Sequence, residues 1–108
     1  MNVRWSERAL AEFADTAAYV AKEFGRQTAQ KMRAKINEAI LNIMQFPQIG
    51  KVCFSDEEPS IEFRELVVKQ SSVIYVIYRE GIYIVSIWNN RQDRNKLYTT
   101  LKNDAKQI

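Results

Sequence analysis

The chain has 108 residues, of which 46% are hydrophobic and 27% charged, and its formal net charge is +3. It contains no histidine and one cysteine, Cys53, which excludes Ser-His and Cys-His nucleophile pairs and an internal disulfide bond, and argues against a zinc site. No apolar run approaches the roughly 20 residues of a membrane span, and the N-terminus lacks the apolar core of a signal peptide. We therefore expect a cytoplasmic protein with no membrane contact, no metal and no cofactor.

The first half of the chain predicts a short strand and two helices. Val3–Trp5 form the expected strand, and Ser6 is placed to cap the helix that follows. Apolar residues then recur every three or four positions in two segments that are separated by Gly25, a natural C-terminal cap. Pro47 ends the second segment, and two helices joined at one glycine predict an antiparallel hairpin. The periodic positions are Leu10, Phe13, Ala17, Val20 and Phe24, followed by Ala29, Met32, Ile36, Ala39, Ile40 and Ile43.

The second half predicts a loop followed by three antiparallel strands. Residues 48–60 read as a loop because they contain Gly50, Pro59 and the acidic run Asp56–Glu58. The short connections between the strands favour hairpins. The expected strands are Ile61–Val68, Ser72–Tyr78 and Ile82–Trp88. The last segment, Lys96–Lys106, predicts a weak helix or a loose tail.

This order of elements, β-α-α-β-β-β, predicts an α+β fold in one domain, residues 1–108. The helical hairpin is expected to pack on one face of a mainly antiparallel sheet. We expect no other element of the chain to cover the opposite face, where Ile, Val and Tyr would form an apolar patch. Such patches are typical of partner sites, and the alternative is a homodimer packed through that face.

The net positive charge lies at the C-terminal end of the chain. Up to Trp88, 11 Lys and Arg balance 11 Asp and Glu, whereas five Lys and Arg face two Asp and Glu from Asn89 onward. Cationic side chains at the end of a rigid sheet are well placed to meet an anionic partner.

An ordered set of short motifs runs through nearly the whole chain. It resembles the RelE/ParE toxin superfamily of bacterial type II toxin–antitoxin systems. The motifs are Trp5 with Ala9-Leu10, Phe46-Pro47 with Gly50, Arg64–Val68, Tyr75–Tyr78 and Arg91–Asp93. The resemblance implies the fold described above and a small, plasmid stabilisation-like toxin held inactive by a cognate antitoxin in a toxin–antitoxin hetero-oligomer. It further implies that an antitoxin segment folds on binding, covers the apolar sheet face and approaches the basic tail at Arg91 and Arg94.

The resemblance implies one of two activities. The RelE branch cleaves ribosome-bound mRNA with cations that stabilise the phosphate and often a Tyr near the C-terminus, whereas the ParE branch inhibits DNA gyrase by binding it. The strand Ser72–Tyr78 has no Arg or Lys where the nucleases place one, since Ser72 or Tyr75 fills that position, and Arg64 precedes Leu66 as in ParE-like sequences. We expect a ParE-type gyrase inhibitor. The alternatives are a RelE-type endoribonuclease, and a degenerate or structural member that acts only through protein–protein contacts.

The candidate site residues follow from this resemblance. Three of these residues also have a purely structural alternative. Arg64 could pair with Glu62 or Glu80 on the sheet surface. Tyr98 could cover the sheet edge, and Trp88 could anchor the core. If the chain is a nuclease, the catalytic candidates are Arg64, Arg91, Arg94 and Tyr98. The candidates for target or antitoxin binding are Arg64, Tyr75, Trp88, Arg91, Arg94 and Tyr98.

Overall fold

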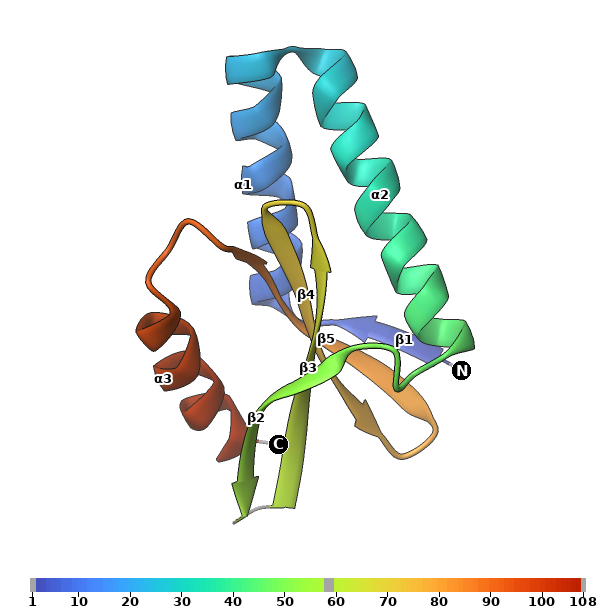
Figure 1. Ribbon diagram of the computed structural model, residues 1–108, viewed down its shortest axis with the longest axis vertical. Coiled ribbons are helices and arrows are strands. Elements are labelled where there is room, and N and C mark those ends of the chain that lie inside the picture. The colour runs from blue at the N-terminus through green and yellow to red at the C-terminus, as the bar shows by residue number, and fades with distance from the viewer. Residues whose placement is uncertain (1, 58–59, 108) are drawn as a thin grey trace.

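The computed structural model describes residues 2–57 and 60–107 (Figure 1). Glu58 and Pro59, which belong to the predicted loop, lie outside the described residues. Within these ranges the sheet has five strands in the order β1-β5-β4-β3-β2. The elements are β1 (Asn2–Trp5), α1 (Glu7–Phe24), α2 (Arg26–Gln45), β2 (Lys51–Glu57), β3 (Ser60–Val68), β4 (Ser71–Tyr78), β5 (Gly81–Asn89) and α3 (Arg94–Ala105).

The helical hairpin forms as the sequence predicts. Ser6 caps α1, because its Oγ accepts a hydrogen bond from the Ala9 backbone N–H at 2.9 Å. Gly25 separates the two helices with φ 96°, a backbone angle that favours glycine. Figure 1 shows the hairpin projecting beyond the sheet at one end. Its inner face joins β4 and β5 in a buried core that includes Ala9, Ile36, Ile43, Val73, Tyr75 and Ile84.

The sheet is mixed. β1 pairs in parallel with β5, from Asn2 opposite Gly81 to Trp5 opposite Ile84, whereas the other neighbours pair antiparallel. The three predicted strands are confirmed as β3, β4 and β5 with ends shifted by one residue. Ile74, Val85 and their neighbours on the two central strands are buried on both faces of the sheet. These strands therefore carry apolar residues on both faces rather than alternating, with Ser71, Ser72 and Ser86 as buried polar exceptions.

The prediction of a loop over residues 48–60 is wrong for Lys51–Glu57, which form the edge strand β2. This strand pairs with β3, and its register shifts between Val52 and Phe54. Such a bulge interrupts the alternation of polar and apolar residues by which a strand is recognised. Charged residues such as Asp56 and Glu57 also suit an edge strand, where they discourage pairing with other chains.

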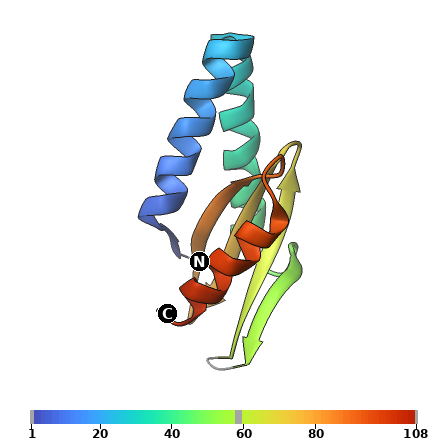
Figure 2. The same cartoon turned by 90° about the vertical axis from the view of Figure 1, so that its left-hand side faces the viewer.

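The prediction that one sheet face is left uncovered is wrong as well. The predicted tail forms a regular helix, α3, which Asp93 caps by accepting a hydrogen bond from the Asn95 N–H at 2.9 Å. Leu97, Leu101 and Ala105 are fully buried against the sheet face opposite the hairpin (Figure 2). Burying each leucine stabilises the fold by about 1.5–3 kcal/mol. α3 thus occupies the patch that was expected to receive a partner or a second copy.

In the described part of the chain, no helix is both long and apolar enough to cross a bilayer.

Candidate functional site

Arg94, at the start of α3, forms a two-pronged ion pair with Glu65 on β3. Its Nη1 and Nη2 donate to Glu65 Oε2 and Oε1, each at 2.8 Å. The same Nη1 donates to Asn90 Oδ1 at 3.2 Å, Asn90 Nδ2 donates to Ser72 Oγ at 2.8 Å, and Ser72 Oγ donates to Glu65 Oε2. These four side chains close a ring that ties α3 to β3, β4 and the turn after β5. We call them the tail network.

The two charged groups of the tail network, Glu65 and Arg94, each stabilise the ionised form of the other. The hydrogen bond from Arg94 holds the pKa of the Glu65 carboxyl below its ordinary value, and the Ser72 hydroxyl acts in the same direction. The pKa of Arg94 is raised, mainly by its hydrogen bond to Glu65. Both groups are therefore charged at neutral pH. Because Glu65 engages both Nη atoms of the guanidinium, the Arg94–Glu65 pair competes with a phosphate for these donors.

Tyr98 lies one helical turn after Arg94 and faces β2. Its ring stacks on Phe54 with a centroid distance of 6.3 Å, and the Arg94 guanidinium carbon lies 5.6 Å from the Tyr98 ring centroid. The structure therefore brings two predicted site residues, Arg94 and Tyr98, into contact. Beside them, burial raises the pKa of the Cys53 thiol to about 11, so this cysteine is protonated at neutral pH and a poor nucleophile.

Arg91 lies in the exposed turn between β5 and α3. Its backbone N–H donates to Asn89 Oδ1 at 2.9 Å, which fixes the turn. Among the described residues its side chain has no hydrogen-bond or ion-pair partner. Of the predicted tail arginines, Arg91 is thus the one whose guanidinium is available to a partner.

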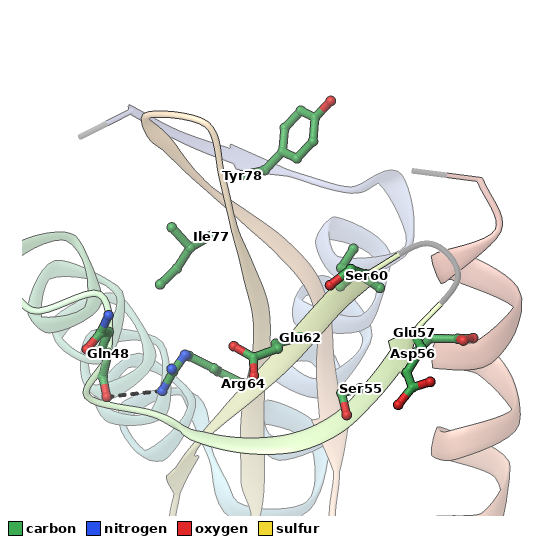
Figure 3. Close-up of a pocket in the computed structure, with 10 residues that line it drawn as sticks. Gln48, Ser55, Asp56, Glu57, Ser60, Glu62, Arg64, Ile77 and Tyr78 are labelled. Carbon is green, nitrogen blue, oxygen red and sulfur yellow. Dashed lines mark hydrogen bonds between the residues drawn. The ribbon is translucent and has the colours of Figure 1, made fainter.

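Arg64 lies on the other face of the sheet from Arg94. It stands opposite Tyr75, which belongs to the core under the hairpin, whereas the next residue, Glu65, stands opposite Ile74 in the core under α3. Its Nη1 donates to the Gly50 carbonyl at 2.8 Å. The same atom donates to the Gln48 carbonyl at 3.4 Å, the bond drawn in Figure 3. The predicted alternative of an ion pair with Glu62 or Glu80, both of which the structure describes, is not found.

The sheet face around Arg64 contains an open hollow of about 520 Å³, shown in Figure 3. Asp56, Glu57 and Glu62 are among the residues that line it together with Arg64. Acidic residues thus outnumber basic ones among the described residues of this lining. Such a composition does not favour a phosphate backbone, which needs several cations.

Tyr75, a predicted binding residue, is fully buried. Its hydroxyl donates to the Pro47 carbonyl at 2.6 Å and accepts from the Gly50 N–H at 2.9 Å, so it fixes the connection between α2 and β2. Trp88, another predicted binding residue, is 6% exposed in the core under α3. In this conformation neither side chain is presented to a partner.

Sequence reasoning missed Glu65, Ser72 and Asn90. The only signal was a carboxylate next to Arg64 in a predicted strand, and its partner Arg94 lies 29 positions later. The described residues contain no group of three or more His, Cys, Asp or Glu side chains that could hold a metal ion.

Residues 3–94 match a family model described as the ParE toxin of the type II toxin–antitoxin system, parDE. Among solved structures, the chain is similar to one from the chromosomal ParDE TA system of P. aeruginosa. The two share 21% identity and a TM-score of 0.66 over 82% of this chain and 95% of that one. It is also similar to a chain of the heterotetrameric YoeB–YefM toxin–antitoxin complex from Staphylococcus aureus, with 17% identity, a TM-score of 0.50, and coverage of 82% and 94%. A search of curated protein sequences found no match. At these identities the two structural likenesses describe the fold.

Proposed function

Because this chain belongs to the ParE toxin family of type II toxin–antitoxin systems, we propose that it inhibits DNA gyrase by binding it and that a cognate antitoxin neutralises it. The inhibition is a binding activity and requires no catalytic group. It takes place in the cytoplasm, where gyrase acts on DNA.

One observation carries this choice: the predicted catalytic cations are divided between the two sheet faces. Arg64 lies under the hairpin side and donates to two backbone carbonyls, whereas Arg94 lies under α3 and is paired with Glu65. A nuclease without histidine needs several cations converging on one phosphate, and losing one such donor typically costs about 10²–10³ in rate. The arrangement therefore favours target binding over phosphodiester cleavage.

We assign the direct target contact to Arg91 and a positioning role to Arg94. The Arg91 guanidinium is exposed and unpaired among the described side chains, and the turn that carries it ends at the tail network. The planar guanidinium binds a carboxylate or phosphate in two-pronged fashion, which a lysine does not reproduce. Arg94 and Tyr98 hold the start of α3, and so the end of that turn, against β2 and β3.

The test is gyrase supercoiling with the purified protein. We expect inhibition by the wild-type chain and a loss of at least about tenfold in potency for Arg91→Ala, equivalent to 1.4 kcal/mol of binding. Arg26→Ala is the matched control, because Arg26 is also an exposed arginine without a side-chain partner among the described residues. Equal potency of the two variants would remove Arg91 from the contact.

The second candidate function is the RelE-type endoribonuclease, which the contact between Arg94 and Tyr98 favours. Toeprinting on translating ribosomes tests it. Codon-specific cuts with gyrase unaffected would replace the first proposal, and Tyr98→Phe together with Arg64→Ala would then identify the catalytic groups. A response in neither assay would favour a member that acts only through protein contacts.

A further inference from the structure

A second hollow, of about 480 Å³, lies at the turn between β4 and β5. It is at the opposite end of β5 from the Arg91 turn. The eight steps between the nine residues of this strand, at about 3.3 Å each, place the two roughly 26 Å apart. Two arginines and two tyrosines give this hollow its chemistry. We call Arg4, Tyr78, Arg79 and Tyr83 the Arg–Tyr site.

The strand register explains how the Arg–Tyr site forms. Val76, Tyr83 and Arg4 stand opposite one another on β4, β5 and β1, so they form a row on one sheet face. Val76 is 1% exposed and supplies an apolar floor. In the next row Tyr78 stands opposite Gly81, and because glycine has no side chain, space remains beside the tyrosine ring.

The arginines of this site are not neutralised by the rest of the described chain. The Arg79 guanidinium carbon lies 5.3 Å from the Tyr78 ring centroid. Neither Arg79 nor Arg4 has an ion pair or a side-chain hydrogen bond with a described residue. Glu80 is the one carboxylate among the described residues that line the hollow. The balance is positive and the two guanidinium groups are open to a ligand.

The chemistry of the hollow fits an acidic protein segment better than a nucleic acid. Two arginines with one opposing glutamate neutralise few phosphates, which gives weak binding to a polyanion. Arginine and tyrosine beside an apolar floor are the residues enriched at the centres of protein interfaces. Each guanidinium can take one carboxylate in a two-pronged hydrogen-bonded pair.

We propose that the Arg–Tyr site is a docking site for a short acidic segment of the antitoxin, in which carboxylates flank an apolar or aromatic side chain. The carboxylates pair with Arg4 and Arg79, and the apolar side chain lies between the two tyrosine rings over Val76. This inference rests on the proposed neutralisation by an antitoxin. It adds a contact at the far end of β5 from the Arg91 turn, so that the two ends of the strand are recognised separately.

Backbone geometry supplies a sharp test variant. Arg79 has φ 57°, and Lys69, in the turn between β3 and β4, has φ 58°. Asparagine tolerates these angles better than arginine or lysine, so Arg79→Asn removes the guanidinium without loss of stability. Lys69→Asn makes the matching change at a turn that does not line the hollow, and it serves as the control.

The experiment measures the dissociation constant between this chain and the full-length product of the adjoining reading frame, with melting temperatures recorded alongside. We expect Arg79→Asn and Arg4→Ala each to weaken binding by about 10- to 30-fold and to flatten its salt dependence, while Lys69→Asn binds as the wild type does. Wild-type affinity in both arginine variants would overturn the Arg–Tyr site and leave the proposed function standing. A neighbouring protein that fails to bind the wild-type chain would overturn the neutralisation itself. Single-stranded oligonucleotide binding that is lost in Arg79→Asn would instead assign the site to nucleic acid.

Discussion

Arg8 in the first turn of α1 is joined by an ion pair to Asp104 near the end of α3, 96 positions later in the chain. The same guanidinium donates to the Val85 carbonyl of β5 at 3.1 Å. The pair raises the pKa of Arg8, with the hydrogen bond to Asp104 as the largest cause. Since the Arg94–Glu65 pair holds the other end, α3 is fixed to the fold by an ion pair at each end.

Arg94→Ala should lower the free energy of unfolding by about 1–3 kcal/mol. The loss arises because Glu65, 12% exposed, keeps its charge but loses both hydrogen bonds to the guanidinium. We expect a loss nearer the lower end of this range, because solvent screens the charge of the partly exposed Arg94 and so weakens the ion pair. Urea unfolding measures the change, with Arg91→Ala as a control that stays within about 0.5 kcal/mol. Equal effects of the two variants would show that the tail network does not stabilise the fold.

Leu101→Ala should cost about 2–5 kcal/mol, the usual range for a fully buried leucine. Leu41→Ala on α2, whose side chain is 63% exposed, is the matched control and should be nearly neutral. Thermal unfolding of the two variants shows whether α3 is packed on the sheet in solution. If Leu101→Ala were as mild as Leu41→Ala, the helix would not be packed on the sheet in solution.

Gly50→Ala should destabilise the chain by about 1–3 kcal/mol through overpacking. A Cβ at this position would lie 2.7 Å from Tyr75 Oη and 3.0 Å from the Glu65 carbonyl oxygen. Gly81→Ala provides the comparison, because its nearest neighbour, the Asn2 carbonyl oxygen, lies 3.3 Å away. Denaturant midpoints should fall further for Gly50→Ala, and the reverse order would contradict the position of the Tyr75 hydroxyl.

Glu65 and Glu12 should change the free energy of unfolding in opposite directions as the pH falls. The pKa of Glu65 is lowered by Arg94 and Ser72, so its contribution to stability is full above the ordinary value of 4.5 and is lost as the pH falls through the lowered pKa. Glu12 accepts hydrogen bonds from Ser86 Oγ and the Ile87 N–H, but burial raises its pKa above 4.5. Its charged form therefore costs stability at neutral pH, and the cost disappears as the pH falls through the raised pKa.

Urea unfolding of Glu65→Gln and Glu12→Gln across pH 7 to 3 tests this pair of signs. Relative to Glu65→Gln, the wild type should lose stability as the pH falls. Relative to Glu12→Gln, it should gain stability over the same fall. A shared direction in both comparisons would contradict the assignment for one of the two carboxyls.

The elements with local signals were predictable from sequence. The Ser6 cap, the Gly25 break and the apolar periodicity between them each act within a few residues, and the hairpin follows from them. The helix α3 was underestimated because its buried face consists of Leu97, Leu101 and Ala105 alone, a weak pattern over 12 residues.

The site itself depends on contacts that no local pattern encodes. Whether Glu65 faces α3 or the hairpin depends on the register of β3, since one residue of slip would exchange Glu65 with Arg64. That register is fixed by the whole sheet. The division of the predicted cations between two faces therefore became visible only with the three-dimensional structure.

The parallel pairing of β1 with β5 also sets the earliest time at which the complete sheet can form. Asn2 meets its partner Gly81 only after the intervening chain has been synthesised, which takes roughly 4–16 s at about 5–20 residues per second. Until then β1 has no strand beside it, and α3, which needs both Arg8 and Glu65, has not been made. The finished surface thus exists only after translation is nearly complete. Under the proposed neutralisation, an antitoxin already in the cell has that interval in which to meet the nascent chain.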